Sequence, residues 1–308
     1  MLDLCLLGTG GMTPMPKRWL TSLMLRCEGS DVLVDCGEGT QIAMKEVGWS
    51  PKSIDIMCFT HMHGDHISGL PGMLLNMANA DRTDPVIMIG PKGLYNVTKS
   101  LCCIAPGLPF ELRFIELDQA TEEYKLGPYV ISCYKVSHSV PCYGYSFTVP
   151  RKGRFDAEKA KELGIPLAYW SRLQKGEVIT DMDLKKTFRP EMVMGPDRKG
   201  LKVTYATDSR PTDSIVRAAA DADVFICEGM YGEPGSEGKA REYRHMTMQE
   251  AAAMAAKAEP NPKELIFTHY SPSMIWPKDY IEDVRSIFPA SFCGKDGLMK
   301  TLDYKEEE

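Results

Sequence analysis

The sequence predicts an α/β layered domain that carries one inserted segment. Short apolar, β-branched runs alternate with stretches of helical periodicity along most of the chain. Polar residues suited to metal binding repeatedly follow the apolar runs. Residues 151–200 break the alternation and are rich in charge, glycine and proline. These observations indicate a catalytic scaffold with a long excursion from its core.

The individual elements follow from periodicity. Residues 1–7 are apolar but carry Asp3 and lack a basic region, so they predict a first strand and no signal peptide. Further strands are expected at 32–34, 54–59, 86–89, 129–136, 143–149, 203–206, 224–227 and 265–268. Helices are expected at 92–105, 156–163, 214–222, 247–258 and 278–288, with a capping box between Thr247 and Glu250. The acidic end, 306–308, is expected to fray.

Cysteine usage predicts a reducing compartment. Four of the ten cysteines, Cys5, Cys58, Cys133 and Cys227, fall within apolar strand-like runs, and no CxxC pair exists. We therefore expect core thiols and a cytoplasmic protein. Cys36 and Cys142 lie near candidate metal motifs and are interpreted as neighbours of the metals, not as ligands. No apolar run is long enough for a membrane span.

The inserted segment differs in charge from the rest of the chain. Residues 151–202 hold 13 Lys/Arg against 8 Asp/Glu, a local charge of +5 in a chain of net charge −6. A basic segment on an acidic body fits either a polyanion-binding arm or a solvated insertion, and charge alone favours neither. Tyr169 and Trp170 in this segment are interpreted as packing anchors in preference to base-stacking residues.

All six histidines lie in short polar motifs that follow apolar runs or precede a helix. The densest motif, residues 60–66, reads Thr-His-Met-His-Gly-Asp-His. Five candidate ligands come within three residues of a predicted strand end: Asp35, His61, His138, Asp208 and His269. Loops beyond strand ends are where active sites gather in sheet proteins.

This spacing predicts a site for two metal ions. His61 and His63 would bind the first ion with His138, and Asp65 and His66 would bind the second with His269. Asp208 would bridge them, because a carboxylate can give one oxygen to each ion. Two Zn²⁺ ions suit these ligands and would activate a bridging water. Mn²⁺, Fe²⁺ and Co²⁺ accept the same ligand types.

These motifs resemble those of the metallo-β-lactamase superfamily and, more specifically, of the ribonuclease Z family, which processes the 3′ ends of tRNA. The resemblance runs in order along nearly the whole chain. It rests on these segments: 7–11 (LGTGG), 35–41 (DCGEGTQ), 60–66 with 69–72 (GLPG), His138 with Gly144-Tyr145, 207–210 (TDSR) and Thr268-His269.

The resemblance implies a four-layer αβ/βα sandwich with two zinc ions, and commonly a homodimer. It further implies that 151–200 is the flexible arm, or exosite, that clamps the tRNA elbow. The family uses a glutamate and a histidine outside the metal ligands, which correspond here to Glu228 and His245. His245, oriented by Glu228, would protonate the departing 3′-oxygen, and Asp65 would accept a proton from the bridging water as well as bind metal.

The leading hypothesis is therefore a zinc-dependent endoribonuclease that removes the 3′ trailer of tRNA precursors. The chain departs from the family pattern at 227–230 (CEGM in place of HEAT), at 76–79 (NMAN, where a Ser-Arg pair is usual) and in the arm (GIPLAYW, where a Pro-Gly-Pro turn is usual). A divergent phosphodiesterase for small diesters, cyclic nucleotides or other RNA is the alternative. A lactonase or thioesterase needs no basic arm, and a purely RNA-binding protein needs neither Glu228 nor His245.

Overall fold

The computed structural model describes residues 1–105 and 107–304, so the acidic end expected to fray lies outside the described residues. The chain divides into two compact units. The larger unit comprises Met1–Thr148 and Leu201–Glu308, and the smaller comprises Val149–Gly200.

The first sheet of the larger unit has seven strands in the order β16-β1-β2-β3-β4-β5-β6. Strands β3 to β6 run parallel to one another, while β1, β2 and β16 are antiparallel to their neighbours. The strand bounds are β1 Leu2–Gly8, β2 Ser22–Cys27, β3 Ser30–Val34, β4 Ile54–Cys58, β5 Val86–Pro91, β6 Leu112–Leu117 and β16 Leu298–Leu302.

The second sheet also has seven strands, in the order β15-β14-β13-β12-β9-β8-β7. Strands β12 to β15 are parallel, and β7 to β9 form an antiparallel meander. The bounds are β7 Thr121–Leu126, β8 Tyr129–Lys135, β9 Tyr143–Arg151, β12 Arg198–Ala206, β13 Val224–Glu228, β14 Leu265–Thr268 and β15 Ser291–Cys293.

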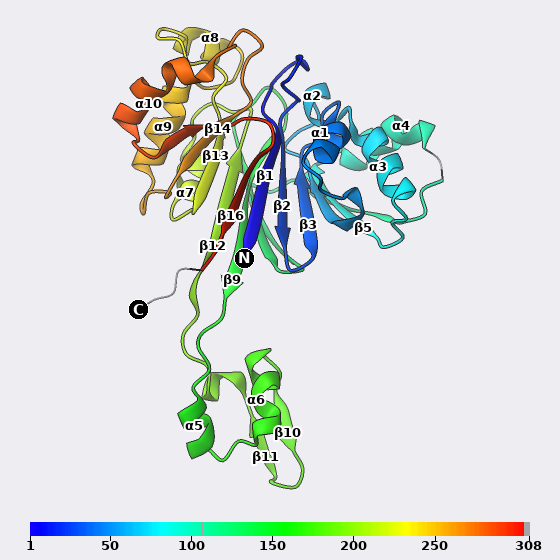
Figure 1. Cartoon of the computed structure of the whole chain (residues 1–308), viewed down its shortest axis with the longest axis vertical. Helices are drawn as coiled ribbons and strands as arrows, with labels where there is room; N and C mark the ends of the chain where they lie inside the picture. The colour runs from blue at the N-terminus through cyan, green and yellow to red at the C-terminus, as the bar shows by residue number, and fades with distance from the viewer. Residues whose placement is uncertain (106, 305–308) are drawn as a thin grey trace. The chain divides into compact units, whose positions relative to one another are not determined.

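Helices cover the outer face of each sheet (Figure 1). Apolar residues of α1, α3 and α4 pack in one core with the first sheet, and those of α7, α9 and α10 pack in another core with the second sheet. The helix bounds are α1 Thr40–Glu46, α2 Gly64–Ile67, α3 Leu70–Asn79, α4 Leu94–Leu101, α7 Asp213–Ala219, α8 Glu237–Glu242, α9 Met248–Lys257 and α10 Ile281–Ile287. The predicted four-layer sandwich is confirmed.

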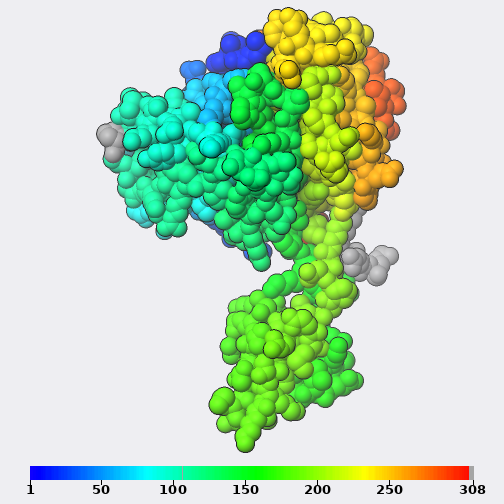
Figure 2. All heavy atoms as spheres, turned by 180° about the vertical axis from the view of Figure 1, so that it is seen from behind, coloured from blue at the N-terminus to red at the C-terminus, as the bar shows by residue number. Residues whose placement is uncertain are grey.

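The two sheets pack face to face through buried side chains. Tyr145 of β9 donates its hydroxyl to the carbonyl oxygen of Phe59, at 2.6 Å, and Thr21 and Thr268 share a hydrogen bond of 2.8 Å. The space-filling view shows the teal and green atoms of the N-terminal half beside the yellow-green atoms of the C-terminal half (Figure 2). The ligand motifs, far apart in sequence, are brought together by this packing.

Two sequence predictions differ in detail from the structure. The helix expected at 92–105 is α4 followed by a separate 3-10 turn at Cys102–Ile104. The helix expected at 278–288 begins as a 3-10 turn, Pro277–Tyr280, and continues as α10. The predicted capping box of α9 is confirmed: Thr247 accepts from the Glu250 amide, and the Glu250 carboxylate accepts from the Thr247 amide.

The smaller unit has its own compact core. It contains α5 Ala157–Glu162, α6 Leu167–Gln174, a 3-10 turn at Pro190–Met192, and an antiparallel hairpin of β10 Ile179–Asp181 and β11 Lys186–Phe188. Tyr169 and Trp170 pack against this core, and the Trp170 indole donates to the Ile165 carbonyl oxygen at 3.0 Å. The interpretation of both aromatics as packing residues therefore agrees with their contacts.

The cysteines match the expected core thiols. All ten cysteines are free, and the four placed in strand-like runs are buried. None of the described helices combines the length and the apolar character that crossing a bilayer requires.

Candidate metal centre

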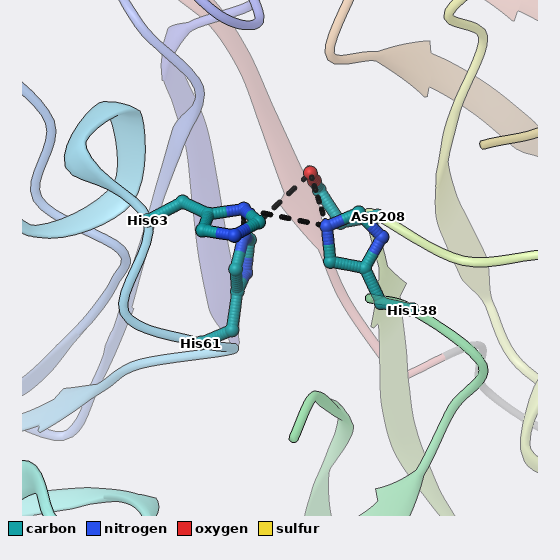
Figure 3. A group of neighbouring side chains, drawn as sticks. All are labelled: His61, His63, His138 and Asp208. Carbon is teal, nitrogen blue, oxygen red and sulfur yellow. Dashed lines mark hydrogen bonds and ion pairs between the residues drawn. The ribbon is translucent and has the colours of Figure 1, made fainter. Parts of the chain in front are cut away.

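Four predicted ligands form a first group in loops that follow strands of both sheets. His61 and His63 follow β4, His138 follows β8, and Asp208 follows β12. Their ligand atoms lie within 4.8 Å of one another. His63 Nδ1 lies 2.9 Å from His61 Nε2 and 3.3 Å from His138 Nε2. The four side chains turn toward one another, His61 and His63 from one loop and His138 and Asp208 from two others (Figure 3).

A second group lies beside the first. Asp65 and His66 are in the short helix α2, and His269 follows β14. His269 Nε2 lies 3.2 Å from His66 Nε2 and 3.5 Å from Asp65 Oδ2. The backbone amide of Met12 donates to Asp65 Oδ2 at 2.7 Å and fixes this carboxylate.

Asp208 connects the two groups through its two carboxylate oxygens. Oδ2 lies 3.7 Å from His61 Nε2, and Oδ1 lies 3.0 Å from His269 Nε2. Asp208 and His269 both adopt positive φ angles, 51° and 55°. Non-glycine residues rarely adopt this conformation, and they do so mainly where the surrounding structure holds a functional side chain in place.

The donor set fits a divalent first-row metal ion. Only imidazole nitrogens and carboxylate oxygens converge here, and His61, His66 and His269 are fully buried. Asp208 Oδ1 is buried and, although His269 Nε2 lies 3.0 Å away, it accepts no hydrogen bond from the part of the chain that the structure describes. Burying a carboxylate oxygen without a hydrogen bond lowers the stability of the fold unless a cation lies next to that oxygen. The seven predicted ligands all belong to these two groups.

The direction of the pKa shift differs among the ligand histidines. Burial, together with the neighbouring His66, holds the pKa of His61 well below its ordinary value, and burial also lowers the pKa of His138. Burial opposes protonation of His66, but the Asp208 and Asp35 carboxylates outweigh it and raise its pKa. Burial likewise opposes the charged form of Asp208, yet the surrounding imidazoles keep its pKa well below the usual range.

Asp35 has a different place from the one that the sequence suggested. It follows β3 as expected, but it belongs to neither ligand group. Its Oδ2 lies 2.8 Å from His66 Nδ1, and its Oδ1 accepts from the Thr60 amide at 2.8 Å. Asp35 therefore orients a ligand histidine, and its interpretation as a candidate ligand is corrected. Carboxylates commonly hold metal-binding histidines in this way.

Glu228 and His245 lie beside these two groups, and His245 also forms a third group of possible ligands with Asp208 and His269. His245 Nδ1 is 3.0 Å from Glu228 Oε2, and Glu228 Oε1 accepts from the Ser209 amide at 2.6 Å. The His245 ring stacks on the His269 ring with centroids 5.5 Å apart. Burial lowers the pKa of His245, but the Glu228 carboxylate outweighs burial and raises it to about 9. At neutral pH this raised pKa favours the protonated imidazole, which is the form that can donate a proton.

A cavity of about 470 Å³ opens beside these residues. This volume is in the range of ordinary small-molecule pockets. Its wall includes His63, His138, His245, Tyr231, Tyr243 and Lys239. The Lys239 ammonium lies 4.9 Å from the centre of the Tyr231 ring. The cavity therefore offers a cation and aromatic faces directly beside the histidine cluster.

The comparisons with known proteins agree with this geometry. The chain is 56% identical over 307 residues to a ribonuclease Z from Lachnospira eligens, with 100% of both chains covered. Its structure resembles that of the short form of human tRNase Z, with a TM-score of 0.69, 22% identity and coverage of 98% of this chain and 100% of that one. It also resembles the metallo-β-lactamase fold protein YhfI from Bacillus subtilis, with a TM-score of 0.69, 17% identity and coverage of 97% and 98%. A family model described as anti-Pycsar protein Apyc1 matches residues 2–102.

The two-sheet sandwich has the metallo-β-lactamase fold, and its histidine–aspartate cluster could hold metal. Together with the full-length ribonuclease Z relatives, these features define a metal-dependent hydrolase of that fold. Over its full length, the chain is more than half identical to proteins named ribonuclease Z. It belongs to the ribonuclease Z family.

Proposed function

We propose that this protein is a metal-dependent endoribonuclease that removes the 3′ trailer from tRNA precursors. The observation that carries the proposal is the pairing of Glu228 with His245 beside a complete set of metal ligands, in a chain that aligns end to end with ribonuclease Z proteins. A hydrolase of activated carboxyl esters needs no protonated imidazole at this position, whereas a ribose 3′-oxygen leaves poorly without a proton.

Two zinc ions are proposed for the ligand groups, His61–His63–His138 and Asp65–His66–His269, with Asp208 shared between them. When bound, such ions activate water and offset the charge of the phosphodiester. Mn²⁺ and Fe²⁺ are compatible with the same donors.

The residues of the chain then account for the proton transfers. Water adds to phosphorus, and the bond from phosphorus to the 3′-oxygen breaks with its electron pair on that oxygen. His245 gives that oxygen a proton, and Asp65 accepts one from the attacking water. The products are a tRNA 3′-hydroxyl and a trailer 5′-phosphate. Glu228 keeps the His245 Nδ1 side occupied, so that Nε2 faces the substrate.

The basic arm and a homodimer belong to the same proposal. The arm, residues 151–202, carries an excess of five positive charges in an otherwise acidic chain, which suits contacts to tRNA phosphates. For dimerisation, Ile42 of α1 and Leu75 of α3 are large apolar side chains that are 47% and 40% exposed, and α1 contacts α3. Large apolar side chains exposed on two contacting helices would be buried in an interface of this kind.

The decisive experiment compares two substrates. Metal-loaded protein is incubated with a 3′-extended tRNA precursor and, in parallel, with bis(p-nitrophenyl) phosphate. We expect cleavage at a single position in the precursor and turnover of the small diester. Hydrolysis of the small diester without cleavage of the precursor would contradict the proposal and favour a phosphodiesterase for small diesters or other RNA.

Charge reversal tests the arm separately. Lys185 and Lys186 are exposed at the β10–β11 hairpin, and Lys92 and Lys99 are exposed in the larger unit. We expect Lys185→Glu/Lys186→Glu to raise KM for the precursor and to reduce its salt dependence, with the small diester unaffected. The matched control, Lys92→Glu/Lys99→Glu, should leave both substrates unaffected. Equal effects of the two variants would remove the arm from substrate binding.

A further inference from the structure

Arg210 holds the backbone of His245 from the loop that carries Asp208. Its Nη1 donates to the His245 carbonyl oxygen and, at 3.0 Å, to Glu250 Oε2, while Nη2 donates to Glu250 Oε1. The Arg210 and Glu250 side chains are only 16% and 20% exposed. A guanidinium is suited to this task because its rigid fork binds a carboxylate and a carbonyl together.

Glu250 links this contact to the start of α9. Its Oε2 also accepts from the Thr247 amide at 3.0 Å, and its own amide donates to Thr247 Oγ1 at 3.1 Å. The amide of His245 donates to the Ala240 carbonyl oxygen at 2.8 Å. The peptide groups on both sides of His245 are therefore fixed, one to α8 and the other to Arg210 and the first turn of α9.

The backbone of Arg210 also binds the loop that carries His138. The Arg210 amide donates to the Ser137 carbonyl oxygen at 2.9 Å, and the Ser137 amide donates to Ser209 Oγ at 3.0 Å. Ser137 directly precedes His138. Arg210 thus joins the loops that carry Asp208, His138 and His245, although its guanidinium contacts only the last of them.

We propose that Arg210 is a positioning residue for protonation of the leaving group. Glu228 sets the rotation of the His245 ring, and Arg210 with Glu250 sets the position of its backbone, so that both are needed to aim Nε2 at the departing oxygen. The proposal rests on the proposed function for the identity of the RNA leaving group. Its chemistry applies to any phosphodiester whose leaving oxygen needs a proton.

The test varies the leaving group in the metal-loaded enzyme. The 3′-alkoxide of RNA needs a proton to depart, phenolate needs it less, and p-nitrophenolate needs none. We expect Arg210→Met to lower kcat on the tRNA precursor by about 10- to 100-fold, which is part of the roughly 100- to 10,000-fold that general acid catalysis supplies, because the proton donor itself is kept. The rate on diphenyl phosphate should fall less, and that on bis(p-nitrophenyl) phosphate should stay within about twofold. KM for the precursor and the bound metal should be unchanged.

A second arginine supplies the matched control. Arg285 also binds a glutamate, Glu282, and a backbone carbonyl, that of Ser291, but on α10. Arg285→Met should leave the relative rates on the three substrates unchanged. Arg210→Lys keeps the positive charge but loses the forked guanidinium. Its kcat on the tRNA precursor should lie between those of the wild type and Arg210→Met.

The outcomes separate the hypotheses. An equal loss on both aryl diesters, or loss of metal, would assign Arg210 a purely structural role and overturn the inference, as would unchanged rates on all substrates. If the wild type does not cleave the precursor, the proposed function is wrong, yet the ratio of the two aryl diester rates still decides the role of Arg210. If Arg210→Met does not fold, Glu250→Gln breaks the same pair and keeps an oxygen for the Thr247 amide.

Discussion

Glu228 binds the ring of His245 and the backbone beside Asp208 with the same carboxylate. Its Oε2 lies 3.0 Å from His245 Nδ1, and its Oε1 accepts from the Ser209 amide at 2.6 Å. Glu228 is fully buried at the end of β13. The orientation of the proposed proton donor is therefore linked to the loop of the shared ligand.

The first prediction concerns this carboxylate. Glu228→Gln keeps the shape of the side chain but removes the charge that holds His245 in its protonated form. We expect kcat on a tRNA precursor to fall by about 100-fold, a typical contribution of general acid catalysis. The rate on bis(p-nitrophenyl) phosphate should change by about twofold or less, because its leaving group needs no proton. His245→Ala should show the same pattern, and intact RNA turnover in that variant would remove His245 from the mechanism.

The second prediction concerns Asp35, which orients His66 without belonging to a ligand group. Asp35→Asn should weaken metal binding by about 10- to 100-fold, as is usual when the partner of a ligand histidine is lost. A competition titration with a chromophoric chelator measures the change. Asp31→Asn is the matched control, because Asp31 is a buried carboxylate of β3, the strand that precedes Asp35, and its partners are Ser53 and Arg26. Equal affinity in the two variants would contradict the role of Asp35.

Much of the scaffold follows from local sequence signals. The apolar runs at 54–59, 203–206 and 265–268 correspond to β4 of the first sheet and to β12 and β14 of the second. Strands β12 and β14 both run parallel to β13, which brings their polar C-terminal neighbours to one edge of the second sheet. A buried strand needs a continuous apolar run, which is why these segments are recognisable.

Other elements carry weaker signals. Strand β7, Thr121–Leu126, has charged residues and is half exposed along its length, because it forms the edge of its sheet. Helix α3 starts with Leu-Pro-Gly, residues that resemble a loop, although proline is well tolerated in a first helical turn. Periodicity alone could not identify either element.

The same limit applies to the site. The ligand types and their positions after strands are visible in the sequence, whereas the contacts between loops are not. Nothing local indicates that Asp35 faces His66, 31 residues away, or that Arg210 binds the carbonyl oxygen of His245, 35 residues away. Each pairing depends on how neighbouring strands of one sheet place the loops that follow them, since Asp35 follows β3 and His66 follows β4, whereas Arg210 follows β12 and His245 lies between β13 and β14.

The third prediction concerns thiols and pH. Burial raises the pKa of Cys5 and Cys133 to about 12, whereas an unfolded thiol titrates near about 8.5. The folded state therefore keeps protons that the unfolded state loses, so stability should be constant below about pH 8 and should fall as the pH rises beyond about 8.5. Urea unfolding between pH 7 and 10 under reducing conditions measures this. A midpoint that rises with pH would have the wrong sign.

The accessibility of the thiols provides an independent check. Cys103 is exposed, Cys102 and Cys293 are partly exposed, and the other seven are buried. At pH 8 a disulfide reagent should modify Cys103 quickly and the two partly exposed thiols more slowly. All ten should react in denaturant, and rapid modification of more than three in the native protein would contradict the buried thiol core.

The fourth prediction concerns Gly11, whose backbone lies against the ring of His269. A Cβ atom at this position would be 2.6 Å from His269 Cε1 and 2.7 Å from Nδ1. Because the Gly11 amide also donates to the Tyr270 carbonyl oxygen at 2.9 Å, the backbone cannot easily move away. The His269 ring must then shift out of its ligand position. Gly11→Ala should lower the free energy of unfolding by about 1–3 kcal/mol, the usual cost of overpacking.

The same variant should lose metal from the group that contains Asp65, His66 and His269. Metal content by elemental analysis and RNA cleavage should fall together, while the first ligand group keeps its ion. Gly238→Ala is the control, since a Cβ there meets no atom within 4 Å and the residue lies in helix α8. That change should stabilise the protein by about 0.5–1 kcal/mol, because alanine favours a helix more than glycine does. Full metal content in Gly11→Ala would show that His269 tolerates displacement, and the close approach of the glycine turn would then serve packing alone.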